Sequence, residues 1–237
     1  MSAEVAARLT RLAARYELPA GADGLLAALL DLVAAEPAAI TAVRDPAEGV
    51  DVHVADSLVA LDVPAVRAAH RIADLGSGGG FPGLALAIAL PTAHVALVES
   101  VGRKCAFLAG AATSLGLANV EVVNARAEAW EEGLGAHDLV AARALAPLPV
   151  VVEYAAPLLA PGGVLVAWKG RSDPAEEADG RAAAAALGMG ESATIPVEPF
   201  AGSRDRHLYL SSKVSPTPAG YPRRTGIARK RPIRASG

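Results

Sequence analysis

Hydrophobic and polar positions in the first sixty residues repeat with the period of α-helices. An amphipathic helix is predicted over residues 2–16, where leucines and arginines fall on opposite sides. A second helix is expected over residues 25–36, capped by Asp23 and ended by Pro37. A third helical segment is predicted from about residue 45 to residue 61. The chain therefore starts with a helical region that precedes any strand.

Beyond residue 70 the pattern changes to short apolar runs that alternate with helical segments. The runs predict strands over residues 71–75, 94–99, 119–123, 137–143 and 164–170, then a closing antiparallel pair over 193–197 and 206–212. This alternation is typical of βαβ units on a parallel sheet. We therefore predict an α/β fold with a doubly wound, mostly parallel, Rossmann-like sheet and an N-terminal helical extension. The expected regions are a helical part (1–69), a core (70–213) and a tail (214–237).

The composition supports a large core in a reducing compartment. Hydrophobic residues make up 52% of the chain and charged residues 20%, which excludes global disorder. The single cysteine, Cys105, cannot form an internal disulfide. The N-terminal sequence lacks a signal-peptide pattern, and no stretch reaches the roughly 20 apolar residues of a membrane span. We expect a cytoplasmic monomer without membrane spans, and the scattered histidines predict no metal site.

Positive charge is concentrated at the end of the chain. Residues 201–237 hold nine of the 22 Lys and Arg residues and one of the 25 Asp and Glu residues, a balance of +8 against −11 for the first 200. A basic tail on an acidic body fits contact with a phosphate backbone, and the alternative is a solvated tail that aids solubility. The residues expected to contact the phosphates of a nucleic acid are Arg223, Arg224, Arg229, Lys230 and Arg231.

A glycine-rich loop follows the first predicted strand. The sequence is Ile72-Ala73-Asp74-Leu75-Gly76-Ser77-Gly78-Gly79-Gly80-Phe81-Pro82-Gly83. Glycines between a strand and a helix let a ligand approach the backbone, as dinucleotides and S-adenosylmethionine do. Gly78-x-Gly80-x-x-Gly83 matches the dinucleotide fingerprint. However, the Asp74 carboxylate would repel a pyrophosphate and attract the ammonium and sulfonium of S-adenosylmethionine, so charge favours the methyl donor over an oxidoreductase cofactor.

Further candidate residues follow the later strands. Glu99 lies 25 residues after Asp74 and can accept hydrogen bonds from the two ribose hydroxyls of either cofactor class. Ala127-Glu128, just past the third strand, would lie near an adenine ring. Arg143 ends the fourth strand, where substrates bind in open α/β sheets. The alternative for Arg143 is a structural salt bridge, to Glu128 or Glu153.

The chain offers no evident nucleophile or general base. After the fourth strand it lacks the Asn/Asp-Pro-Pro-aromatic loop of many amino-group methyltransferases. Cys105 lies inside a predicted helix and is assigned to the core rather than to a thiolate nucleophile. His53 and Asp56 could share a helix face, a pairing that is more often structural.

These motifs together resemble the bacterial small-subunit ribosomal RNA guanine-N7 methyltransferases, the glucose-inhibited division protein B family. Besides the glycine loop, the resemblance rests on residues 40–45, His53, Asp56-Ser57-Leu58, Glu99-Ser100, Arg103-Lys104, Phe107-Leu108, Arg126-Ala127-Glu128, Arg143-Ala144, Lys169-Gly170 and the Tyr221-Pro222-Arg223-Arg224 tail. It implies a class I methyltransferase in which Gly76, Phe81, Ala127, Glu128 and Arg143 line the S-adenosylmethionine pocket. It also implies 16S ribosomal RNA, or the small subunit, as substrate.

The expected reaction is methyl transfer to guanine N7, with Arg143 orienting the base. N7 carries a lone pair and no proton, so transfer needs alignment and removal of water rather than a base. The full set of expected donor-binding residues is Asp74, Gly76, Ser77, Gly78, Gly80, Phe81, Glu99, Ser100, Ala127, Glu128 and Arg143. The alternatives are a related methyltransferase acting on another RNA site or a small molecule, and a non-catalytic RNA-binding member of the fold. Departures from the family pattern at Ala39 and Val52 bear on the RNA target.

Overall fold

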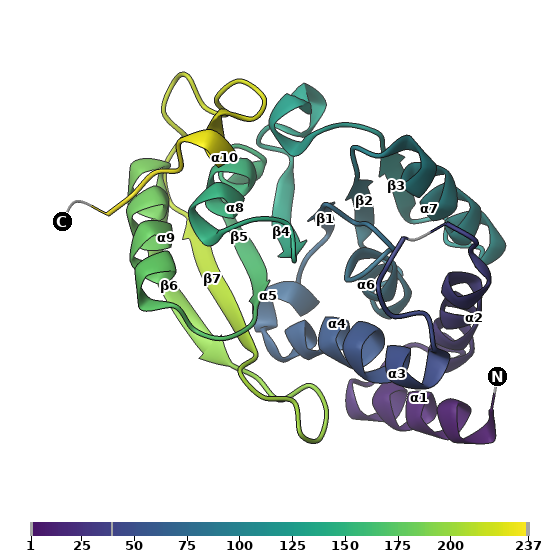
Figure 1. The fold of residues 1–237 in the computed structure, drawn as a ribbon. Coiled ribbons are helices and arrows are strands. Elements are labelled where there is room, and N and C mark those ends of the chain that lie inside the picture. Colours follow the sequence, from purple (N-terminus) through teal and green to yellow (C-terminus); the bar gives the residue numbers. More distant parts are fainter. Residues whose placement is uncertain (1, 39, 236–237) are drawn as a thin grey trace.

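A computed structural model describes residues 2–38 and 40–235. Seven strands of this part form one sheet, which runs through the centre of the molecule (Figure 1). The strand order is β3-β2-β1-β4-β5-β7-β6. β1 to β5 pair in parallel, while β7 runs antiparallel to both β5 and β6. The strands are β1 (Arg71–Leu75), β2 (His94–Val98), β3 (Val120–Val123), β4 (His137–Arg143), β5 (Leu159–Lys169), β6 (Met189–Pro196) and β7 (His207–Lys213). The predicted mostly parallel sheet and its antiparallel closing pair are confirmed.

Helices cover both faces of this sheet, because successive strand residues point to opposite sides and each side is apolar. One cluster packs α1, α2, α4, α6 and α7 against strand residues such as Ile72 and Leu139. The other packs α8, α9 and α10 against residues such as Leu75 and Val140. The helices are α1 (Ala3–Arg15), α2 (Ala22–Ala35), α3 (Pro46–Gly49), α4 (Asp56–Leu58), α5 (Pro64–Arg67), α6 (Gly83–Ala89), α7 (Gly102–Ser114), α8 (Leu148–Ala155), α9 (Pro174–Ala186) and α10 (Ile227–Lys230). The sheet is doubly wound.

The N-terminal helices follow the sequence prediction with one correction. α2 begins at Ala22, after Gly21 in the left-handed conformation (φ +82°), so Asp23 does not cap it. Instead, Asp23 accepts a hydrogen bond from Thr10 Oγ1 at 2.7 Å and ties α2 to α1. The predicted third segment exists, capped by the Asp45 side chain. It contains a π-helical turn (Val50–Ala55) between α3 and α4, followed by a 3₁₀ turn (Val59–Asp62).

The last parallel strand is longer than predicted. β5 starts at Leu159 rather than at Val164, because Gly162-Gly163 lies within the strand where its register with β4 shifts. A Cβ at Gly163 would lie 2.9 Å from the His137 carbonyl oxygen, so glycine permits the two backbones to meet there.

The basic tail crosses the top of the molecule beside α8 (Figure 1). Sequence pattern shows little sign of helix there, yet residues 227–230 form α10. Ala228 of this helix is 3% exposed and belongs to the core cluster under α8 and α9. The described part of the tail is therefore docked on the core. Within residues 2–38 and 40–235, no helix is both long and apolar enough to cross a membrane.

Candidate functional site

The predicted site residues come together at the carboxyl edge of the parallel strands. Leu75 at the end of β1 pairs with Val98 of β2 and with Ala142 of β4. The glycine loop, Glu99 and Arg143 follow directly from these three positions. Parallel strands end at one edge of the sheet, where α/β proteins bind ligands.

The glycine loop adopts a backbone that side chains would prevent. Gly76 and Gly80 have φ values of +72° and +94°. A Cβ would lie 2.7 Å from Leu145 Cδ1 at Gly76 and 2.5 Å from Leu84 Cδ1 at Gly80. The amides of Gly76 and Ser77 both donate to the Val98 carbonyl oxygen, which fixes the loop against β2. The turn is thus held close to the sheet with its backbone open to a ligand.

Asp74 lies beneath this loop. Its side chain is fully buried, and its Oδ2 accepts a hydrogen bond from the Gly83 amide at 3.0 Å, where α6 begins. Burial raises the pKa of Asp74 to about 6, against the effect of the Ser77 and Gly83 hydrogen bonds. Among the residues that the structure describes, its Oδ1 has no hydrogen-bond partner. Asp74 lines neither of the clefts described below, so its contact with a donor ammonium remains a prediction, and its observed role is to fasten the loop.

Glu99 fastens the other side of the loop. Its Oε2 accepts from the Gly78 amide at 3.1 Å and its Oε1 from the Val101 amide at 2.8 Å. Cys105 in α7 is 8% exposed and donates from Sγ to the Glu99 carbonyl oxygen at 3.1 Å. Burial, aided by the Glu99 charge, raises the pKa of this thiol. The prediction that Cys105 belongs to the core is confirmed.

A first cleft of about 250 Å³ lies over the strand ends. It is lined by five residues that the sequence predicted for the donor: Gly76, Glu99, Ser100, Ala127 and Glu128. The other predicted donor residues of the loop, Ser77, Gly78, Gly80 and Phe81, are not among its lining residues. The cleft also includes side chains that sequence reasoning did not assign to a donor: Lys104, Arg126, Tyr154 and Arg229.

A second cleft of about 200 Å³ adjoins the first. It is lined by Asp56, Arg143, Trp168, Lys169, Arg206 and His207. Ala144 and Leu145 line both clefts and so form a shared wall. Ala144 has a φ of +52°, which is uncommon for a residue other than glycine and is found at functional sites.

Arg143 is held by the N-terminal helical region. Its Nη1 donates to Asp56 Oδ2 at 2.8 Å and to the Val52 carbonyl oxygen at 3.0 Å. Asp56 Oδ1 lies 3.4 Å from Nη1 of Arg206. The salt bridge weighed for Arg143 exists, but neither Glu128 nor Glu153 is its partner. At Val52 the contact is made by the main chain, while the other departure, Ala39, lies outside the described residues.

Phe81 lies between a histidine and this arginine. The Phe81 and His53 rings are stacked at 4.6 Å with an interplanar angle of 8°. The Arg143 guanidinium lies 5.9 Å from the Phe81 ring centre, within cation–π range. His53 Nε2 contacts the Val43 carbonyl oxygen at 2.9 Å, and burial lowers the His53 pKa. His53 therefore does not pair with Asp56 but packs against the back of the loop.

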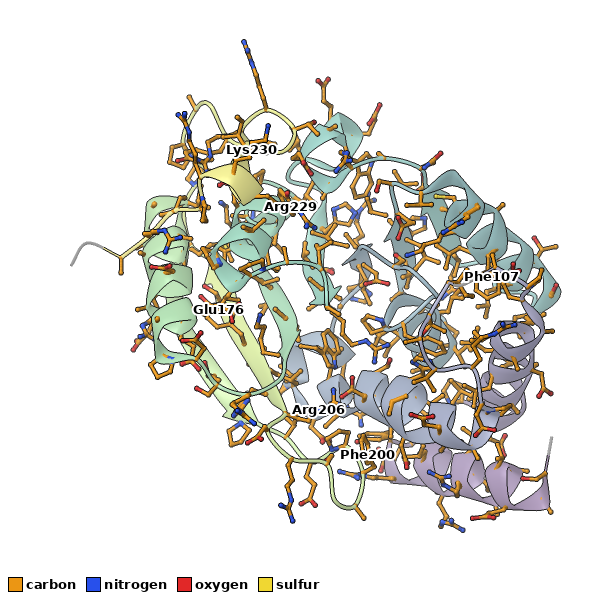
Figure 2. All side chains as sticks on the ribbon, viewed as in Figure 1. Phe107, Glu176, Phe200, Arg206, Arg229 and Lys230 are labelled. Atoms are coloured by element: carbon orange, nitrogen blue, oxygen red, sulfur yellow. The ribbon has the colours of Figure 1, made fainter. Side chains whose placement is uncertain are left out.

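Five tail cations were predicted to bind RNA, and they lie in different surroundings. Arg223 forms a two-pronged ion pair with Glu153, whose side chain is 1% exposed. Arg229 lines the first cleft, next to exposed Lys230 on the same short helix (Figure 2). Arg224 and Arg231 are exposed. RNA contact by these residues remains a prediction.

A glycine loop after β1, an acid after β2 and a cleft over the strand ends form a nucleoside-binding site, on a fold that this chain shares with class I S-adenosylmethionine-dependent methyltransferases. A solved S-adenosylmethionine-dependent O-methyltransferase from Thermotoga maritima has the same fold, with a TM-score of 0.54 and 17% sequence identity. The similarity covers 80% of this chain and 72% of that one.

The chain belongs to the GidB family, described as rRNA small subunit methyltransferase G, whose model matches residues 26–209. It is 45% identical over 200 residues to Ribosomal RNA small subunit methyltransferase G of Rubrobacter xylanophilus, which covers 82% of this chain and 77% of that protein. It is 45% identical over 201 residues to the protein of the same name from Roseiflexus castenholzii, covering 82% and 83%. The resemblance drawn from the motifs is confirmed. The matched region ends within β7, so the tail lies beyond it.

Proposed function

We propose that this enzyme transfers a methyl group from S-adenosylmethionine to N7 of a guanine in 16S ribosomal RNA. The observation that carries the proposal is the pair of adjoining clefts at the carboxyl edge of the parallel strands. Gly76, Glu99 and Glu128 line the first cleft, beside the cations Lys104, Arg126 and Arg229. Arg143, Lys169 and Arg206 line the second and outnumber its one acid, Asp56. The acids of the first cleft can accept hydrogen bonds from a nucleoside, and the excess of cations suits the second cleft to an anionic nucleotide. Methyl transfer requires such neighbouring sites, and here Ala144 and Leu145 form their shared wall.

The first cleft offers chemistry that suits the donor. Gly76 presents bare backbone to it, and its two acids can accept hydrogen bonds from ribose hydroxyls and an exocyclic amine. When bound, S-adenosylmethionine supplies an electrophilic methyl group on its sulfonium. The chain itself would bind the nucleoside through Glu99 and Glu128 and keep the loop in place through Asp74.

The second cleft would hold the target base. Guanine N7 attacks with its own lone pair and loses no proton, so the chain needs to align the base and exclude water. Arg143 is suited to orient the base because Asp56 and the Val52 carbonyl fix its guanidinium. Trp168, fixed by a 2.6 Å hydrogen bond from Nε1 to the Asp56 carbonyl oxygen, supplies an apolar wall. A ribosomal substrate would be met in the cytoplasm, and we propose that the enzyme acts there as a monomer.

Labelled methyl donor and small ribosomal subunits from a strain that lacks this family's enzyme test the proposal. We expect label in 16S RNA that chromatographs as N7-methylguanine after digestion. Label in another nucleotide, or in a small molecule only, would support a related methyltransferase. Donor binding without any transfer would support a non-catalytic RNA-binding protein.

A further inference from the structure

We propose that the tail helix α10 forms a wall of the donor cleft, with Arg229 as a donor-contacting residue. The identity of the ligand, a cationic purine nucleoside, rests on the proposed function. The assignment of Arg229 rests on geometry in a segment beyond the family match. It gives the basic tail a role in binding the methyl donor in addition to any contact with RNA.

Arg229 is an exposed residue of α10 that lines the cleft and binds the wall shared with the second cleft. The side chain lines the cleft together with Glu128 and Tyr154. Its Nη2 donates to the Leu145 carbonyl oxygen at 2.9 Å. The Leu145 side chain lies directly over Gly76, and Leu145 also lines the acceptor cleft. The Arg229 guanidinium thus links the tail to the wall that the two clefts share.

The tail is anchored on both sides of this arginine. Ahead of it, the Gly226 amide donates to Glu128 Oε1 at 3.1 Å, so a cleft-lining acid also binds the tail backbone. Next to it, Ala228 is 3% exposed under α8. Arg223 is held by the buried Glu153 and also donates to the Arg231 carbonyl oxygen at 2.9 Å. These contacts fix the tail backbone on both sides of Arg229 and so hold this residue at the cleft.

The surroundings of Arg229 favour the adenosine end of the donor. Ala127 and Glu128 line that end of the cleft, and Glu128 is the acid to which the tail backbone is bound. Burial and the Glu128 charge raise the pKa of the Tyr154 hydroxyl, while Arg229 opposes that shift. A planar guanidinium can cover a purine ring and still donate hydrogen bonds at its edge. Arg229 would therefore close the cleft over the base.

Calorimetric titration of the full chain with S-adenosylhomocysteine tests this assignment, with Lys230→Ala as the matched control. Both substitutions remove one positive charge from α10. We expect Arg229→Ala to weaken binding at least tenfold, Arg229→Lys to weaken it less, and Lys230→Ala to change it less than twofold. Equal affinity of wild type and Arg229→Ala would overturn the proposal. So would an Arg229→Ala variant that loses affinity only for unmethylated small subunits.

Hydrogen exchange of the wild-type chain gives a second readout without substitutions. S-adenosylhomocysteine should increase the protection of the amides between residues 221 and 231. Unchanged exchange there, with protection confined to the glycine loop, would contradict a tail wall. A wild-type chain that binds no S-adenosylhomocysteine would reject the proposed donor itself. Failure of the variant comparison alone would reject only the role of Arg229.

Discussion

Asp56 and Arg143 lie 87 residues apart in the sequence and form an ion pair of 2.8 Å at the acceptor cleft. Their side chains are 3% and 15% exposed. The N-terminal helical region therefore supplies the counter-charge for the residue that ends β4. The helices of this region precede the sheet in the sequence. Through this contact they take part in the site as well as covering a face of the core.

Removal of the Asp56 carboxylate should destabilise the fold. Asp56 is the shared partner of Arg143 and Arg206. Asp56→Ala leaves both cations without this counter-charge, with an expected cost of about 3 kcal/mol in the free energy of unfolding. Asp51→Ala is the matched control, because it breaks the more exposed Arg8–Asp51 pair and should cost about 0–1 kcal/mol. Urea unfolding of both variants measures the difference. Equal costs would show that the Asp56 pair contributes no more than a surface pair.

A side chain at Gly76 should abolish donor binding. Valine there would require a left-handed backbone at φ +72°, and its Cβ would lie 2.7 Å from Leu145 Cδ1. We expect Gly76→Val to reduce the affinity for S-adenosylhomocysteine at least a hundredfold in calorimetry. Gly110 in α7 is the control, since a Cβ there meets no atom of the described residues within 4 Å. Gly110→Ala should raise the free energy of unfolding by about 0.5–1 kcal/mol and leave donor binding unchanged.

Asp74 should make stability depend on pH in an unusual direction for a carboxylate. Its pKa is about 6 in the folded chain against 3.8 in the unfolded chain, so the folded state binds more protons between these values. The stability linked to its protonated form is complete below pH 3.8 and is lost as the pH rises to about 6. The amide of Asp74→Asn does not titrate. The stability of this variant relative to wild type should therefore increase between pH 4 and pH 6, by a total of roughly 3 kcal/mol. Urea unfolding at several pH values measures this difference, and a difference that does not change with pH would contradict the raised pKa.

The Arg223–Glu153 pair should anchor the tail. Arg223→Ala leaves a carboxylate with 1% side-chain exposure unpaired, at an expected cost of about 3 kcal/mol. The double variant Arg223→Met with Glu153→Leu removes both charges and should unfold close to wild type. Thermal and urea unfolding compare the two. A double variant as unstable as Arg223→Ala would show that the unpaired Glu153 carboxylate is not the cause of the lost stability.

Local patterns in the sequence were sufficient to predict the sheet and the glycine loop. Strand β4 was predicted with the bounds that it has, because the apolar run over residues 139–142 lies between Gly135 and Arg143. The meeting of the loop, Glu99 and Arg143 followed from one rule, that parallel strands end at the same edge. The family resemblance followed from the same short motifs.

The partners of the charged side chains could not be predicted in this way. The sequence offers several acids as partners for Arg143. The partner in the structure is Asp56, which directly follows a π-helical turn that sequence periodicity does not indicate. The tail has the composition of a solvated arm. Its docking depends on scattered apolar residues, Tyr221, Ala228 and Ile233, which gave the one available signal. Asp74 was expected to face the ligand, but the direction of its side chain is set by the α6 amide it binds.

The environment of Cys105 has a practical consequence for experiments on this enzyme. The natural chain carries one thiol, and that thiol is enclosed and hydrogen-bonded to the backbone. A cysteine placed at position 230 would be far more accessible to maleimide dyes than the native thiol. A fluorescent dye can therefore be attached at one chosen position without first replacing Cys105. Ligand binding at the first cleft could then be followed in real time through a dye on the C-terminal segment.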